Sequence, residues 1–142
     1  MAEPLFERAR PLLESPAPAV LMTYRASGEA SISPVWFRWH DDAFEVVIAE
    51  GDAKLRRLER DPRCSLLIFE AVPPFRGVEA SGEAELIRGD ATPVRAAISG
   101  RYLGGAREGE RYAESRRSKP GVVLRLAPAD AKAWDLAGIL PR

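Results

Sequence analysis

The stretch that decides the fold reads AFEVVIAEGDAKLRRLER and occupies residues 43–60. Its first part, 43–48, is apolar and rich in β-branched residues, which is typical of a buried strand. Its last part carries Leu55 and Leu58 among cations, the pattern of a short amphipathic helix. The glycine-containing corner between them, 49–54, opens a helix N-terminus, where unpaired backbone N–H groups can bind an anion. The stretch therefore predicts a strand, a corner and a basic helix, with a possible anion site at the corner.

Composition limits what the rest of the chain can be. With 142 residues, 46% of them hydrophobic, we expect a single domain over 1–142 with one core. Lys and Arg number 21, as do Asp and Glu, so no overall field attracts nucleic acid or an anionic membrane. The chain has no apolar run long enough for a membrane span and no signal-peptide pattern at its start. We expect a cytoplasmic protein with a local anion site.

Several kinds of chemistry are excluded by the residues present. The chain has one histidine and one cysteine, which rules out a multi-imidazole or multi-cysteine metal centre and an internal disulfide. We expect His40 to lie in an exposed turn and Cys64 to be a core thiol. No serine-nucleophile, Walker or dinucleotide motif is present, and the glycines at 100–105 follow a helix, the wrong context for phosphate. A reaction carried by a bound redox cofactor remains.

The pattern elsewhere indicates consecutive strands with few helices. Pro34 lacks a donor for a sheet, which predicts an edge or bulge in its strand. Thr92 resembles an N-cap followed by Pro93 at the first helical position. Such a run of strands favours an antiparallel barrel of about seven strands with two or three added helices. In chain order we expect a short or kinked helix at 4–13, strands at 19–24, 30–39, 43–48, 63–69 and 75–87, a helix at 92–103, a charged helix or loop at 107–119, and strands at 122–126 and 132–136.

Two motifs in order identify a possible family. Residues 31–37 read Ser-x-Ser-Pro-Val-Trp-Phe, and residues 51–67 read Gly-x-Ala-Lys-x-x-x-Leu-x-x-Asp-Pro-Arg-x-Ser-Leu-Leu. Together with the strand that follows Arg76, they resemble the flavin-binding split barrels. That superfamily includes pyridoxamine 5'-phosphate oxidase and the flavin- and deazaflavin-dependent oxidoreductases. The resemblance covers roughly residues 15–127 and implies a mainly β fold, a six- to seven-stranded antiparallel split β-barrel with peripheral helices.

The resemblance also implies a function and a site. It implies a homodimer that binds FMN or coenzyme F420 in two grooves between the subunits and transfers a hydride to or from a small organic substrate. The backbone at 33–36 would line the ring, and Lys54 would reach the phosphate. Arg38, Arg76 and Trp134 are candidates for the groove wall, and no catalytic side chain can be named. The full set of expected cofactor-binding residues is Ser33, Pro34, Val35, Trp36, Ile48, Gly51, Lys54, Arg57 and Arg76.

Departures from the family pattern keep an alternative open. Glu50 and Asp52 stand at the corner where many relatives carry arginine, and Asp52 can cap the helix itself. A carboxylate about 4 Å from a phosphate costs roughly 4 kcal/mol per pair of unit charges at an effective dielectric of about 20. Gly77 replaces a glutamine found in some relatives. The alternative is a non-catalytic protein that binds flavin, deazaflavin or haem, or one that has lost its cofactor; a structural or interaction module is also compatible.

Overall fold

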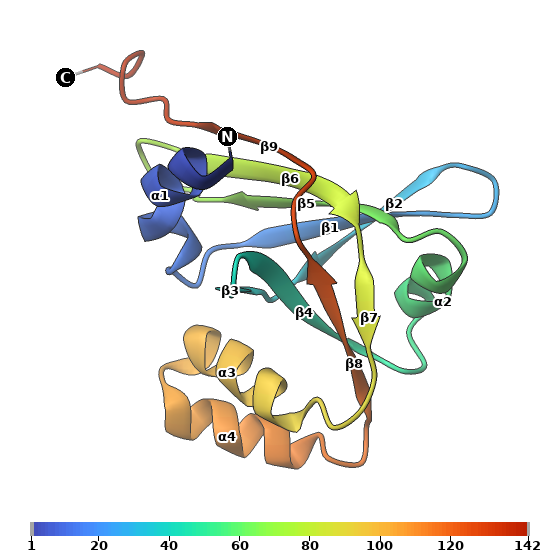
Figure 1. Ribbon diagram of the computed structural model, residues 1–142. Helices are drawn as coiled ribbons and strands as arrows, with labels where there is room; N and C mark the ends of the chain where they lie inside the picture. The colour runs from blue at the N-terminus through green and yellow to red at the C-terminus, as the bar shows by residue number, and fades with distance from the viewer. Residues whose placement is uncertain (1, 142) are drawn as a thin grey trace.

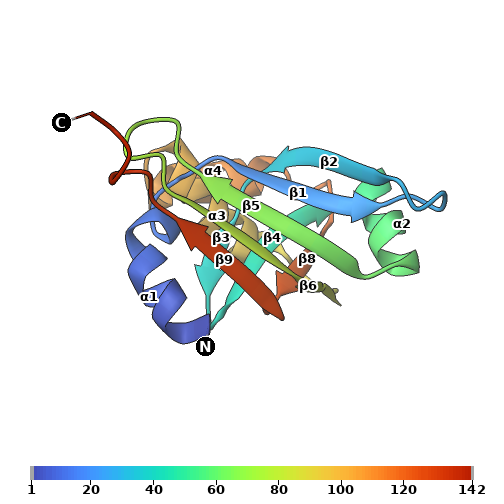
Figure 2. The same cartoon turned by 90° about the horizontal axis from the view of Figure 1, so that it is seen from above.

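Two antiparallel sheets form the framework of the computed structural model, which describes residues 2–141 (Figure 1). One sheet has five strands in the order β2-β1-β5-β6-β9, and the other has four in the order β3-β4-β8-β7. Figure 2 looks onto the five-stranded sheet, with β2 and β9 at its opposite edges. The elements are α1 (Ala2–Leu13), β1 (Ala19–Tyr24), β2 (Ala30–Val35), β3 (Arg38–His40), β4 (Ala43–Ala49), α2 (Ala53–Arg60), β5 (Arg63–Phe69), β6 (Gly77–Glu83), β7 (Glu85–Ile87), α3 (Thr92–Leu103), α4 (Ala106–Ser115), β8 (Gly121–Leu126) and β9 (Asp130–Trp134).

The chain passes directly from the five-stranded to the four-stranded sheet at two breaks, and it returns through α2 and through the segment between β8 and β9. One falls at 36–37, between β2 and β3, and the other at Ala84, between β6 and β7. The sequence pattern predicted one strand across each break, and both predictions were wrong because the alternation of side chains continues while the hydrogen-bonding partner changes. This explains nine short strands in place of about seven. Pro34 lies on β2, the edge of its sheet, as predicted, and pairs with Val20 of β1.

The core lies between the sheets and is covered at one end by α1. Phe37 and Phe44 are fully buried at its centre. Phe6 of α1 stacks on Trp39, with ring centroids 4.6 Å apart, and packs edge-on against Phe44. The helix runs through Pro11 to Leu13, because a proline near the end of a helix removes only one late backbone bond. Val35 and Trp39 pack against this core on either side of Phe37, whereas Trp36 between them points outward.

The remaining helices match the sequence pattern closely. Leu55 and Leu58 are buried on α2, as predicted, and α3 ends at Gly104, whose φ of 107° is left-handed. Thr92 is not the N-cap of α3: the cap residue is Ala91, and the Asp90 carboxylate accepts the Thr92 N–H at 3.0 Å. None of the helices in the described part of the chain is both long and apolar enough to cross a membrane.

Helices α3 and α4 form a closely packed hairpin below the four-stranded sheet (Figure 1). Gly109 of α4 lies against the backbone of α3, so that a Cβ built on it would overlap Ala96 O and come within 2.6 Å of Gly100 N. Only glycine allows this approach, because the neighbouring atoms are backbone and cannot move aside independently.

Gly109→Ala is therefore expected to lower the free energy of unfolding by about 1–3 kcal/mol through overpacking. In an unconstrained helix, the same change would be favourable by about 1 kcal/mol, so the sign of the effect is diagnostic. Gly51→Ala is the control, since nothing lies within 4 Å of a Cβ built there. Urea denaturation measures both, and a Gly109→Ala protein as stable as the wild type would contradict the packing.

Candidate functional site

Tyr102 of α3 joins the helical hairpin to both sheets. Its hydroxyl donates a hydrogen bond to Ala17 O at 2.9 Å and accepts one from the Phe37 N–H at 3.3 Å. Its ring stacks on Trp36, with centroids 5.1 Å apart and planes 8° from parallel. Burial raises the pKa of Tyr102, which keeps the phenol protonated as a donor. The outward-facing Trp36 is therefore held in one position at the break between β2 and β3.

Arg101 fixes the same part of α3 from the other side. Its Nη2 donates to Leu13 O at 3.0 Å and to Ser15 O at 2.6 Å. The guanidinium lies 4.9 Å above the centre of the Phe37 ring. Burial lowers the pKa of Arg101, which nevertheless remains a cation at neutral pH. The end of α3 is thus tied to the loop that precedes β1.

An apolar cavity of about 610 Å³ opens beside this stacked pair. Pro34 and Val35 of β2 line one wall, and Trp36, Tyr102 and Tyr112 contribute aromatic rings. Trp36 is 38% exposed, so one of its sides remains accessible. The volume and the planar walls fit an aromatic ring system, which would gain both apolar burial and stacking.

A second cavity, of about 340 Å³, continues from the first. It shares Trp36 and Tyr112 with the apolar cavity and reaches Asp52 at the corner before α2. Its other polar walls come from α3 and from the segment after α4, and these residues are Arg95, Arg116 and Lys119. The two cavities together give a groove that is aromatic at one end and charged at the other.

The corner itself is closed by the chain's own carboxylate. Asp52 is the N-cap of α2 and accepts the Lys54 N–H at 2.8 Å, while its other oxygen lies 2.8 Å from Lys54 Nζ. Burial would raise the pKa of Asp52, but the hydrogen bonds from Lys54 outweigh it and the pKa is lowered. The pair therefore stabilises the fold above the pKa of the unfolded carboxyl, and this contribution is lost as the pH falls through the folded value.

The structure brings together only part of the expected cofactor-binding set. Pro34, Val35 and Trp36 line the apolar cavity, and Ser33 lies on the opposite face of β2 from Pro34. Gly51 is exposed at the corner with Lys54, and Arg57 is near enough to lower the pKa of Asp52. Ile48 is buried in the core.

Arg76 and Trp134 lie away from the groove beside Trp36. Arg76 binds both oxygens of Glu70, each at 2.8 Å, and these hydrogen bonds lower the pKa of Glu70 to about 2. With Trp134 it lines a separate cavity of about 270 Å³, where the Trp134 ring covers the backbone at Gly77. Arg38 pairs with the buried carboxylate of Glu45 at 2.7 Å. Within one chain, none of the three lines the groove beside Trp36.

Sequence reasoning missed the contribution of the α3–α4 segment. It placed Tyr102 on a helix and treated 107–119 as a charged helix or loop, although Tyr112, Arg116 and Lys119 of that segment line the groove. The sequence shows Tyr102 and Tyr112 as aromatic residues of this segment, but only the tertiary fold places them beside Trp36. His40 is exposed as expected, but it is the last residue of β3 and not part of the turn that follows. Burial raises the pKa of Cys64 to about 12, as expected of a core thiol.

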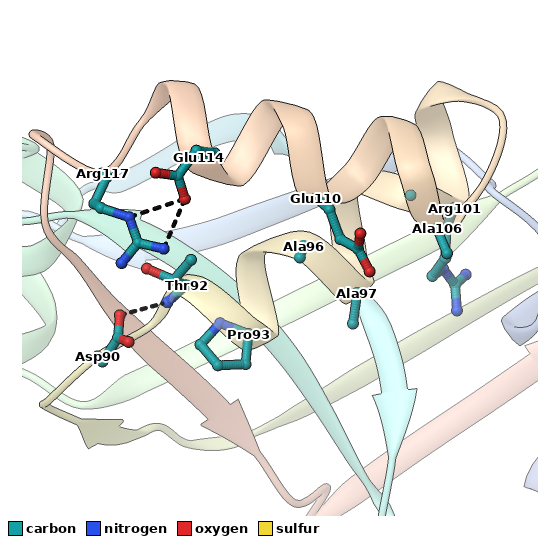
Figure 3. Close-up of a pocket in the computed structure, with 11 residues that line it drawn as sticks. Asp90, Thr92, Pro93, Ala96, Ala97, Arg101, Ala106, Glu110, Glu114 and Arg117 are labelled. Atoms are coloured by element: carbon teal, nitrogen blue, oxygen red, sulfur yellow. Dashed lines mark hydrogen bonds and ion pairs between the residues drawn. The ribbon is translucent and has the colours of Figure 1, made fainter.

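A further cavity, of about 780 Å³, lies on the α3–α4 hairpin and contains none of the expected residues (Figure 3). Its floor consists of small side chains such as Ala96 and Ala97. Charges at its rim bind one another or the backbone, since Glu114 holds Arg117 at 2.7 Å and Asp90 holds the Thr92 N–H. Among the residues that the structure describes, no group of His, Cys, Asp and Glu could hold a metal ion.

Comparison with known structures supports the same architecture. The fold is similar to that of the conserved hypothetical protein Rv2991 from Mycobacterium tuberculosis, with a TM-score of 0.82 and 22% identity over 96% of this chain and 88% of that one. An F420 reductase gives a TM-score of 0.69 and 19% identity over 87% and 94%. The haem storage protein HutZ from Vibrio cholerae gives 0.65 and 17% over 91% and 92%. No curated protein sequence matches significantly.

The two sheets that exchange strands at both breaks define a mainly β, antiparallel split-barrel protein. A family profile described as "Pyridoxamine 5'-phosphate oxidase" matches residues 5–135. The chain belongs to this family.

Proposed function

We propose that the protein is an oxidoreductase that binds FMN or coenzyme F420 in the groove beside Trp36. The observation that carries the proposal is the apolar cavity of about 610 Å³ whose aromatic wall, Trp36 on Tyr102, is fixed by hydrogen bonds. Membership of the family and the likeness to an F420 reductase support it. The substrate would be a small organic molecule that enters from the exposed side.

The chain's own residues have binding and positioning roles in this proposal. Pro34 and Val35 present backbone to one edge of the cavity, and Trp36 with Tyr102 supplies a flat wall. The corner at Gly51, Lys54 and Arg57 lies at the charged end. A flavin or deazaflavin, when bound, supplies hydride transfer. The protein contributes orientation and the exclusion of water from the ring.

Haem binding is the second candidate, favoured by one observation. Tyr112 lines both cavities, and a tyrosine phenol can serve as an axial ligand to haem iron. HutZ, a haem storage protein, shares the fold. His40 does not line the groove and is the exposed last residue of β3, where its Nε2 is 3.3 Å from Asp41. A haem would therefore depend on a phenol and not on an imidazole.

We also propose that two copies of the chain close the groove. β2 is an edge strand, so one row of its backbone groups is open to a partner. Ile32 is 69% exposed on the same face of β2 as Pro34, and the alternation continues to the partly exposed Trp36. A second copy covering this apolar row would shield the cavity from solvent on its open side.

Titration of the purified protein with FMN, F420 and haem, followed by absorbance and fluorescence, tests the proposed ligand. We expect saturable binding of FMN or F420, and an affinity reduced about tenfold by Trp36→Ala because one aromatic stacking partner is lost. Trp36→Phe keeps an aromatic wall and is the control. Binding of haem alone would favour the second candidate, and binding of none of the three would contradict the enzyme proposal.

Sedimentation equilibrium tests the proposed dimer. The wild type is expected at about twice the 15.6 kDa of one chain. Ile32→Arg should shift the protein toward the monomer, since it places a charge in the apolar row. Ile87→Arg on β7, which places the same charge on an exposed isoleucine of the other sheet, is the control. A monomeric wild type would exclude the dimer.

A further inference from the structure

The charged end of the groove contains more positive charge than the family motif accounts for. Arg95, Arg116 and Lys119 line the 340 Å³ cavity together with one carboxylate, Asp52. That carboxylate already has a cationic partner in Lys54 at 2.8 Å. Across the described residues, none of the three cations forms an ion pair with a carboxylate of its own. The cavity therefore has uncompensated positive charge.

Arg95 fixes the backbone that carries the other two cations. Its Nη1 donates to Arg116 O at 3.2 Å and to Lys119 O at 2.9 Å, which ties the segment after α4 back onto α3. A Cβ built on Gly121 would lie 2.8 Å from Arg95 Nη2, so the missing side chain leaves the space that the guanidinium occupies. Arg116 is held further by Tyr112, whose ring centre is 5.5 Å from the guanidinium carbon.

The corner before α2 is a weaker anion site than its position suggests. Asp52 accepts the Lys54 N–H and also holds the Lys54 ammonium. A phosphate at the corner would have to displace this carboxylate or lie against it, at a Coulomb cost. The neighbouring acid, Glu50, does not line the cavity. The donors still available in this cavity are therefore on the α3–α4 segment.

We infer that Arg95, Arg116 and Lys119 form the binding site for the phosphate of the cofactor, while Lys54 serves to neutralise Asp52. The inference rests on the proposed function, since it assumes a ring beside Trp36. A ligand with its ring in the apolar cavity places its phosphate-bearing tail in the adjoining cavity, because the two share Trp36 and Tyr112. Guanidinium and ammonium groups are the side chains that bind phosphate most strongly. The site selects phosphorylated over unphosphorylated ring compounds.

Two ligands that differ only in the phosphate separate this site from ring binding. FMN and riboflavin, which differ only in this way, are titrated against the wild type. F420 and 8-hydroxy-5-deazariboflavin, which lacks the whole phosphate-containing tail, are the deazaflavin pair. We expect the phosphorylated member of each pair to bind more tightly than the unphosphorylated one. The double substitution Arg116→Gln/Lys119→Gln should lower the ratio of the two affinities at least about tenfold. The affinity for the unphosphorylated member should change little. Arg107→Gln/Arg111→Gln, an equal loss of charge from exposed positions of α4, is the matched control.

A second pair of variants tests the role of Lys54. Lys54→Met should weaken binding of the phosphorylated ligand, because it leaves Asp52 charged and uncompensated at the cavity. Adding Asp52→Asn should restore most of the lost affinity, since asparagine still caps the helix. If Lys54 were itself the phosphate ligand, the double variant would remain weak. That result, or a preference unchanged in Arg116→Gln/Lys119→Gln, would overturn the inference.

Failure of ring binding would have a different signature. If the wild type binds neither member of either pair, the proposed function fails. Titration with inorganic pyrophosphate, followed by the NMR chemical-shift changes of the backbone amides, then tests the anion site independently of ring binding. Shifts centred on Arg95, Arg116 and Lys119 support the site, whereas shifts confined to the corner at Gly51–Lys54, or no shifts, overturn it.

Discussion

The hydroxyl of Tyr102 joins three segments that are far apart in the sequence. It bonds to the loop before β1 through Ala17 and to the break between β2 and β3 through Phe37. The ring of the same residue supports Trp36, which would otherwise be an exposed tryptophan at the edge of a sheet. Arg101 next to it holds α3 in place. The aromatic wall of the groove, and with it the proposed ring site, depends on this contact between hairpin and barrel.

The corner before α2 shows how a recognisable motif can change its role. In the family pattern the lysine at the position of Lys54 is associated with a phosphate. In this protein Asp52 occupies the helix N-terminus and takes both the backbone N–H and the ammonium of Lys54. The positive charge facing the groove comes instead from α3 and the segment after α4. In the proposed site, the cations that bind the phosphate therefore lie on α3 and on the segment after α4.

Much of the fold follows from sequence patterns, because those patterns are local. The edge position of Pro34, the leucine face of α2 and the end of α3 before its glycines were all predicted and are confirmed. The strand breaks at 36–37 and Ala84 were not, because strand periodicity is the same on both sides of each break and does not reveal a change of sheet. Thr92 was predicted as the N-cap because Pro93 follows it. The side chain that accepts a backbone N–H at this helix start is instead Asp90, two residues earlier.

The site was less predictable than the fold for a related reason. Pro34 to Trp36 belong to a contiguous motif and could be named, whereas Tyr112 and Lys119 come together with them only through the packing of α3–α4 on the barrel. A charged segment such as 107–119 has the composition of ordinary solvated surface. Its role depends on which face meets the groove, and sequence periodicity alone does not report that.

The central claim is that a ring binds against Trp36 and Tyr102. Intermolecular nuclear Overhauser effects between bound FMN or F420 and the isotope-labelled protein test it most directly. The structure predicts contacts from the aromatic protons of the ring to the Trp36 indole and the Tyr102 and Tyr112 rings. Contacts confined to the outer hairpin groove, at Ala97 and Glu110, would contradict the account, as would a bound ligand with no contact to Trp36.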